Sequence, residues 1–448
     1  MPTDREKIEQ WSLGYHLLKS YTDFCFKIYF RTKVIGLKKL PTGKSLIFAP
    51  NHQNSLIDAL AVLSIKRWQP VFLARADVFK GKTLCKILTF FKILPVYRIR
   101  DGYQNLALND DIFRKTLDVL KNRNGIGILP EGNHFGQRRL RTLKKGIARI
   151  SFQAEDACNN ELKIQIIPVG LNYSNYINLR SKLLIRLGEP IDVSKYLDLY
   201  RQNPAQAYNA LIEELEISMK KEMIQIDDEV TYYEYESLRE IFTPLYIKKN
   251  RLSCSQNSQF EVDKKMIAAV DGYKIKDMSG FDSLMNQVKE YSIKIKEAGL
   301  TYKSVQKSAF KLWSLIVKIL ILIATLPLFV YGYVNNFIPV AVAYKISKKI
   351  KDDQFISSIR FVVGMLLFPI AYLIQTLLFW AISGNGVYAL NYLASLLIGA
   401  IIAYQWRKCY YNAVADLKWV KVILTKKELK NNLIDLDSLI GNTIERLM

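Results

Sequence analysis

The sequence predicts an α/β domain followed by a helical membrane region. Between residues 33 and 192, short apolar runs alternate with helix-like stretches, and Pro, Gly or Asn separate them. Three later runs, at 312–344, 361–382 and 387–406, are almost continuously apolar and approach or exceed the roughly 20 residues that cross a bilayer. A buried helix of a large soluble core would look similar, but three such runs in succession favour the membrane.

Each part of the α/β domain is expected from its local pattern. Strands are predicted where short apolar runs end at turn residues, at 45–49, 71–74, 126–129, 164–172 and 183–187. Helices are predicted at 55–66, 79–91, 110–122 and 143–157. The domain is assigned to 33–200.

Helical segments flank this domain on both sides. Residues 1–32 mix aromatic side chains such as Trp11 and Phe24 with lysines, which fits helices lying at a membrane interface; helices packed in a core with a solvated charged face are the alternative. Residues 201–311 are polar and helix-forming and predict a helical linker without a recognisable site. Residues 409–448 predict a cytosolic helical tail.

Basic clusters bracket the apolar runs and predict their orientation. Because lysine and arginine concentrate on the cytosolic side, 361–406 is expected to form a transmembrane hairpin whose uncharged turn lies outside. The stretch 312–344 contains Lys318 and is interrupted by Asn335, Asn336 and Pro339, which predicts a re-entrant or broken helix over a single tilted crossing. We therefore expect an integral membrane protein with its α/β domain on the cytosolic face, at the inner membrane if the source is bacterial.

The charge balance predicts an anionic partner. The chain has 64 basic and 41 acidic residues, a formal net charge of +23. The basic residues are spread along the chain and flank apolar segments, which favours membrane lipids and phosphorylated substrates over nucleic acid. The five cysteines form no C-x-x-C pair, so no metal site is expected.

Catalytic chemistry is predicted at His52, one of only three histidines. His52 follows an apolar strand, and Asp58 lies just inside the next helix. A carboxylate there can hold one imidazole nitrogen while the other takes a proton from a substrate hydroxyl. The alternative is that His52 caps the helix and Asp58 complements its dipole.

Two further clusters predict anion binding. Leu129-Pro130-Glu131-Gly132 follows a strand, and Arg98 follows the apolar segment 94–97. Glycine lets the backbone approach a ligand, and the cations could pair with phosphate, although a solvated basic loop has the same composition. The basic residues after the glycine are Arg138, Arg139, Arg141, Lys144 and Lys145.

The order of these motifs resembles the glycerolipid acyltransferase family, which includes lysophosphatidic acid and glycerol-3-phosphate acyltransferases. Four blocks carry the resemblance: Asn51-His52 through Asp58; Val96-Tyr97-Arg98; Leu129-Pro130-Glu131-Gly132 with Lys145-Gly146 downstream; and Ile167-Pro168-Val169-Gly170 before Gly188-Glu189-Pro190-Ile191. The resemblance covers about residues 33–192 and implies a mixed sheet flanked by helices.

The resemblance also implies the reaction. His52 would act as general base and Asp58 would orient it, while Arg98, Glu131 and Gly132 would bind a glycerol-phosphate acceptor. Asn51 and Lys145 belong to the matching blocks and are expected at the substrate site. The donor would be an acyl thioester of coenzyme A or acyl carrier protein, and no metal or redox cofactor is implied.

Two departures from the commonest family pattern affect these expectations. Five residues separate His52 from Asp58, where the family usually has four. The longer spacing resembles a branch of the family that includes fungal glycerol-3-phosphate acyltransferases. The third block continues as Asn133-His134 where threonine and arginine are typical, so the phosphate is expected to be bound by Arg138, Arg139 or Arg141. His134 is then either a second catalytic group or a surface residue.

Two other functions fit the same motifs. One is lysophospholipid remodelling or acylation of an amine-containing lipid, and the other is a non-catalytic lipid-binding membrane protein.

Overall fold

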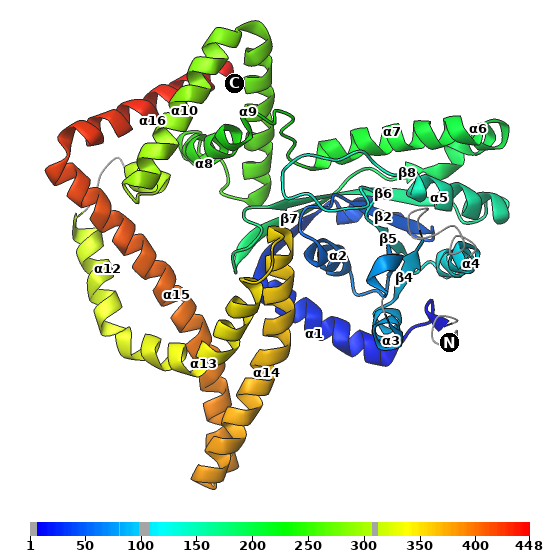
Figure 1. Ribbon diagram of the computed structural model, residues 1–448, viewed down its shortest axis with the longest axis horizontal. Coiled ribbons are helices and arrows are strands. Elements are labelled where there is room, and N and C mark those ends of the chain that lie inside the picture. The colour runs from blue at the N-terminus through cyan, green and yellow to red at the C-terminus, as the bar shows by residue number, and fades with distance from the viewer. Residues whose placement is uncertain (1–6, 80, 98–107, 307–311) are drawn as a thin grey trace. The chain divides into compact units, whose positions relative to one another are not determined.

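The computed structural model describes residues 7–79, 81–97, 108–306 and 312–448. The chain divides into two compact units (Figure 1). The first consists of Met1–Gln225 and Ile346–Val362, and the second of Ile226–Lys345 and Val363–Met448. The first unit thus includes a segment that is far from the α/β domain in sequence.

The first unit is built on one mixed sheet. Its strands are β1 (Phe30–Ile35), β2 (Leu46–Pro50), β3 (Val71–Arg75), β4 (Ile93–Val96), β5 (Ile126–Ile128), β6 (Gln165–Tyr173), β7 (Ser181–Leu187) and β8 (Ile191–Asp192). The order is β1-β7-β6-β2-β5-β3-β4, with β8 pairing β6. The strands from β6 to β4 run parallel, whereas β7 is antiparallel to β6. The expected mixed α/β sheet is confirmed.

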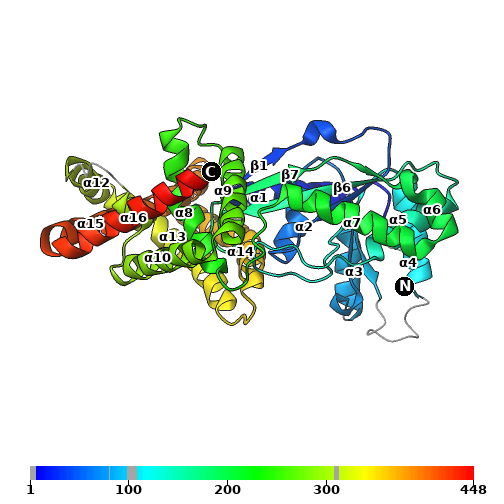
Figure 2. The same ribbon diagram turned by 90° about the horizontal axis from the view of Figure 1, so that it is seen from above.

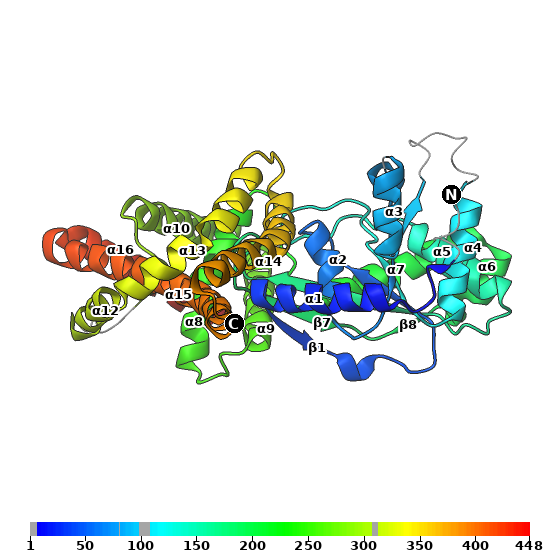
Figure 3. The ribbon, with the colours of Figure 1, turned by 90° about the horizontal axis from the view of Figure 1, so that it is seen from below.

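Helices cover both faces of this sheet, as the fully buried strand β2 requires. The helices are α1 (Leu13–Tyr29), α2 (Leu56–Leu63), α3 (Lys82–Phe90), α4 (Leu108–Lys121), α5 (Gly146–Ala157), α6 (Leu197–Gln202) and α7 (Pro204–Glu222). Ile47 and Ala49 of β2 share a hydrophobic core with α4, α5 and α7. Helices α1, α2 and α3 lie on the opposite face of the sheet (Figures 1 and 3).

The five predicted strands are present, but β1, β4 and β8 were not predicted. Strands β1 and β4 are the two edges of the sheet. An edge strand is partly exposed and lacks the apolar run of a central strand. Strand β1 is mostly half-exposed, and β4 is four residues long and contains Pro95. Strand β8 has only two residues.

The second unit is helical. It contains α8 (Tyr232–Lys249), α9 (Gln256–Lys276), α10 (Met278–Glu297), α11 (Tyr302–Val305), α12 (Leu312–Ala324), most of α13 (Leu326–Ser347) and α14 (Ile356–Ser383), α15 (Gly386–Thr425) and α16 (Lys427–Leu447). Helices α8, α9, α10 and α16 pack together (Figure 2). Among the described residues, three stretches are long and apolar enough to cross a membrane, which supports membrane association: Leu326–Ser347, Asp353–Ser383 and Gly386–Thr425.

The break in the helix lies between Ala324 and Leu326, and not at Asn335, Asn336 and Pro339 as predicted. Helix α12 ends at Ala324 and α13 begins at Leu326, and α13 then continues through all three residues. Asn336 stays helical because its amide nitrogen donates to the Gly332 carbonyl and its oxygen accepts from Tyr372. The polar groups that predicted an interruption are thus satisfied by the helix itself and by a neighbouring helix.

Candidate active site

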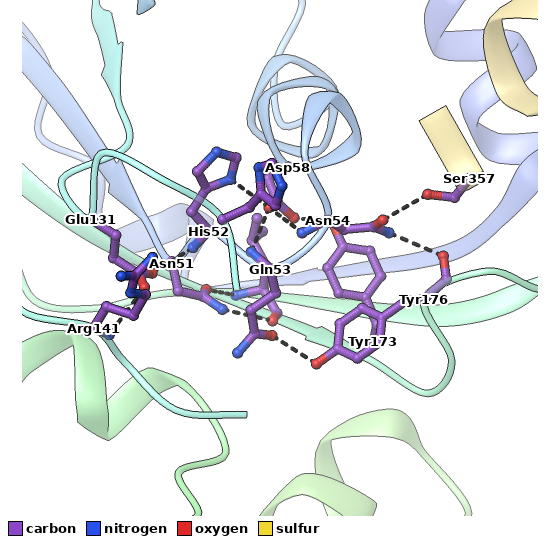
Figure 4. A network of polar contacts seen from close by, with 12 residues as sticks. Asn51, His52, Gln53, Asn54, Asp58, Glu131, Arg141, Tyr173, Tyr176 and Ser357 are labelled. Carbon is purple, nitrogen blue, oxygen red and sulfur yellow. Dashed lines mark hydrogen bonds and ion pairs between the residues drawn. The ribbon is translucent and has the colours of Figure 1, made fainter. Parts of the chain in front are cut away.

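The site forms where the carboxyl ends of β6, β2 and β5 lie side by side, the usual position for a site in an open parallel sheet. His52 follows β2, and its Nδ1 lies 2.9 Å from Asp58 Oδ2 (Figure 4). The Asp58 carboxylate is fully buried, whereas 15% of the His52 side chain is exposed. Because a carboxylate only accepts, Nδ1 carries the hydrogen and Nε2 is free to act as a base.

Asp58 also organises the loop that carries His52. Its Oδ2 accepts from the backbone N–H groups of Gln53, at 2.7 Å, and Asn54, at 2.6 Å. Its Oδ1 accepts from the Tyr173 hydroxyl at 2.7 Å. Burial first, and then the Asp58 carboxylate, raise the pKa of Tyr173 well above its usual value, so this hydroxyl keeps its proton. Four donors therefore fix a single carboxylate beneath the imidazole.

The loop between His52 and Asp58 turns at Ser55. This residue has a φ of 47°, a conformation that few non-glycine residues adopt, and α2 begins directly after it. The turn lets the loop close onto Asp58 although the spacing is longer than usual. The longer motif and an intact histidine–aspartate pair are thus compatible.

Glu131 holds the same loop from the side of β5. Its Oε1 accepts from the His52 backbone N–H at 2.6 Å, and its Oε2 accepts from the Arg141 N–H at 3.0 Å. Burial raises the pKa of Glu131 from 4.5 to about 7; the two N–H donors oppose this effect, and Asp58 adds to it. Glu131 therefore titrates near neutral pH.

We expect the stability contributed by Glu131 to fall as the pH rises from about 4.5 to 7. The unfolded side chain ionises at the lower pH and the buried one at the higher, so the folded state loses on the order of 3 kcal/mol across this window. Glutamine mimics the protonated acid. The melting temperatures of Glu131→Gln and of the native protein would be measured between pH 5.5 and 8. We expect the melting temperature of the native protein to fall relative to that of Glu131→Gln as the pH rises. A difference that stays constant over this range would contradict the expectation.

Two predicted substrate-binding residues make contacts within the protein. The Asn51 amide donates to the Leu171 carbonyl at 3.3 Å and accepts from the Leu171 N–H at 2.6 Å, so it ties the loop to β6. Glu131 is 3% exposed and both of its oxygens are used. These contacts give both residues a role in holding His52, and whether either touches substrate stays a prediction.

The predicted phosphate-binding arginines do not lie in one environment. Arg138 is 3% exposed and donates to the Tyr173 carbonyl at 2.6 Å. Arg139 and Arg141 instead place their guanidinium groups over the Phe135 ring, 5.6 and 5.8 Å from its centroid. Phe135 donates its backbone N–H to the His52 carbonyl at 3.0 Å, so two cations gather beside the loop that carries His52.

The remaining predicted residues lie at the same edge of the sheet, except Arg98, which is outside the described residues. Gly132 has a φ of 70°, which explains the glycine, and forms the turn after β5. Lys145 is exposed at the start of α5. Arg98 lies outside the described residues, so its role stays a prediction. Sequence reasoning missed Tyr173 and Phe135, because neither has a distinctive local motif.

The sequence of the α/β unit is similar to known proteins. Residues 31–172 match the protein-family model described as Acyltransferase. Glycerol-3-phosphate O-acyltransferase 2 of Saccharomyces cerevisiae is 23% identical over 323 residues, which is 65% of this chain and 42% of the relative. Glycerol-3-phosphate O-acyltransferase 1 of the same yeast is 26% identical over 165 residues, 36% of this chain and 21% of the relative.

A crystal structure of the 1-acyl-sn-glycerophosphate acyltransferase from Thermotoga maritima aligns with a TM-score of 0.30 at 17% identity, over 45% of this chain and 79% of that one. That likeness is too distant to carry an argument. The chain spans less than half the length of either yeast relative. The α/β unit contains an acyltransferase domain. The match to the Acyltransferase model over residues 31–172 agrees with the family resemblance that the four motifs carry.

Proposed function

We propose that this protein is a membrane-bound O-acyltransferase that transfers a fatty acyl group from a coenzyme A or acyl carrier protein thioester to glycerol-3-phosphate. The geometry that supports the proposal is the His52–Asp58 pair, with Nδ1 held at 2.9 Å and the histidine side chain partly exposed. The names of the two yeast relatives favour glycerol-3-phosphate over its 1-acyl derivative as acceptor.

The proposed reaction is a general-base acyl transfer. His52 Nε2 removes the proton from an acceptor hydroxyl, and the oxygen attacks the thioester carbonyl carbon to give a tetrahedral intermediate. The Asp58 carboxylate stabilises the imidazolium that forms. The intermediate collapses, the carbon–sulfur bond breaks, and the thiolate takes the proton from His52. The products are an ester and a free thiol.

Arg139 and Arg141 are the proposed phosphate-binding residues. Arginine pairs with phosphate oxygens through charge-assisted hydrogen bonds, and both guanidinium groups lie over Phe135 beside the His52 loop. Arg138 is less suited to this role because it is buried against the Tyr173 carbonyl.

Replacing Arg139 and Arg141 together by glutamine should raise the acceptor KM by about tenfold or more, since each lost bond to a charged group is worth about 1.5–3 kcal/mol. The KM for the acyl thioester should change little. Arg149→Gln, an exposed change on α5, is the matched control. Initial rates at varied acceptor concentration measure the effect, and an unchanged acceptor KM in the double variant would exclude the assignment.

The proposed location is the cytosolic face of a membrane. Three helices are long and apolar enough to span it. Helix α1 also presents a stripe of exposed apolar side chains, Leu13, Leu17, Phe24 and Ile28, at helical spacing. An acyl chain partitions into lipid while glycerol-3-phosphate is soluble, so this reaction belongs at the interface. The basic residues that flank the apolar runs support the cytosolic side.

The acceptor can be identified by comparing four candidate acceptors. The full chain in detergent would be given palmitoyl-CoA with glycerol-3-phosphate, 1-acyl-glycerol-3-phosphate, lysophosphatidylcholine or glycerol, and thiol release followed. We expect the highest kcat/KM with glycerol-3-phosphate and almost none with glycerol, which has no phosphate. A preference for lysophosphatidylcholine would instead support the remodelling function.

A further inference from the structure

The segment Ile346–Val362 belongs to the unit that carries the active site, although it lies between two stretches of the membrane region. It includes the last residues of α13, the 3-10 helix η7 (Asp353–Phe355) and the start of α14. Phe361 packs edge-on against Phe26 and Tyr29, at the end of α1. The segment therefore packs as part of the acyltransferase unit.

Two hydrogen bonds attach this segment to the catalytic loops. Asp352 Oδ2 lies 2.8 Å from His134 Nε2, two residues after Gly132. Ser357 is fully buried, and its hydroxyl pairs with Asn54 Oδ1 at 2.6 Å (Figure 4). Asn54 is also a backbone donor to the catalytic Asp58. Both attachments thus reach residues that surround His52.

His134 is held beside His52 by packing as well as by its hydrogen bond. The two imidazole rings meet edge to face, with centroids 5.5 Å apart and planes at 85°. On its other side His134 meets the Phe355 ring at 4.9 Å and 90°. The ring is therefore fixed between the catalytic histidine and η7.

Asp352 determines which His134 nitrogen is available. Partial burial would raise the pKa of Asp352, but hydrogen bonds from His134 and from the Gln354 N–H lower it, so the carboxylate is ionised and accepts. Nε2 of His134 then carries a hydrogen. Nδ1 has no partner among the described residues and remains for a ligand. A substrate held at His52 would lie next to this ring.

We propose that Asp352 is a positioning residue of the acyl-transfer site, which fixes His134 beside His52 so that His134 Nδ1 accepts a hydrogen bond from a hydroxyl of the acceptor. This inference rests on the proposed function. It gives a role in acceptor binding to the histidine that stands where the family usually has an arginine. It also makes acceptor binding depend on a segment that adjoins the membrane helices.

The test compares Asp352→Ala, Asp352→Asn and Asp353→Asn in the full chain. Asp353 is the matched control because it is adjacent, exposed and of the same charge. We expect Asp352→Ala to raise the acceptor KM by about tenfold or more while the acyl-CoA KM stays within twofold. Asparagine has one accepting oxygen, which can serve Nε2 but not Gln354 as well, so Asp352→Asn should recover only part of the loss. His134→Ala should match Asp352→Ala.

Equal acceptor KM values in Asp352→Ala and Asp353→Asn would overturn the positioning role while leaving the proposed function intact. Failure of the native protein to acylate any acceptor would instead count against the proposed function. Hydrogen exchange of residues 348–356 then tests the inference without activity. Exchange should accelerate in His134→Ala, and unchanged exchange would show that the pair does not hold the segment.

Discussion

His52→Ala is expected to lower kcat by about 10²- to 10⁴-fold, the usual contribution of a positioned general base. Its Nε2 is the proposed base, because the hydrogen bond to Asp58 occupies only Nδ1. The acceptor KM should change much less, because binding relies on the arginines and His134. Steady-state thiol release at saturating substrate measures this effect.

His16→Ala is the matched control for this substitution. His16 lies on α1 and packs against Trp11, away from the polar network around Asp58. It should retain activity within about twofold, because it contacts no catalytic group. If the two alanine variants had the same kcat, His52 would not be the base.

Asp58→Asn should have the second large effect, a fall in kcat of about 10²- to 10⁴-fold with the protein still folded. The amide oxygen can keep accepting from the His52 side, and the amide nitrogen can donate to the Tyr173 hydroxyl, so the site stays satisfied. What is lost is the negative charge that stabilises imidazolium. Loss of this charge should also shift the pH dependence of kcat.

Tyr173→Phe distinguishes the contribution of the Asp58 charge from that of the hydrogen bonds that hold Asp58 in place. It removes one hydrogen bond to Asp58 Oδ1 and leaves the carboxylate charged. A loss no larger than about tenfold is expected, as for one buried hydrogen bond. A Tyr173→Phe defect as severe as that of Asp58→Asn would show that geometry, and not charge, is the main contribution of Asp58.

The sequence predicted the centre of the fold because each central strand contains a short run of apolar residues. It also predicted His52 and Asp58, because the pair occurs between a strand and a helix in a histidine-poor chain. The edge strands β1 and β4 were missed since partial exposure removes the apolar pattern. Local signals thus sufficed where burial was complete.

Other parts of the site depend on contacts between distant residues, which no local pattern reports. Asp352 lies 218 positions from His134, in a stretch that reads only as a basic linker between membrane helices. Likewise, Arg138 and Arg141 look equivalent in sequence, but one is buried against a carbonyl and the other is exposed. Tertiary packing therefore determines which arginine side chains are available to bind substrate.

The most direct test of the proposed function is to identify the product. The purified full chain would be incubated with palmitoyl-CoA, or palmitoyl acyl carrier protein, and glycerol-3-phosphate, and the lipid and free thiol quantified together. We expect one lysophosphatidic acid for each thiol released, and neither product from His52→Ala. Thiol release without acylated glycerol-3-phosphate, or equal product from His52→Ala, would contradict the proposal.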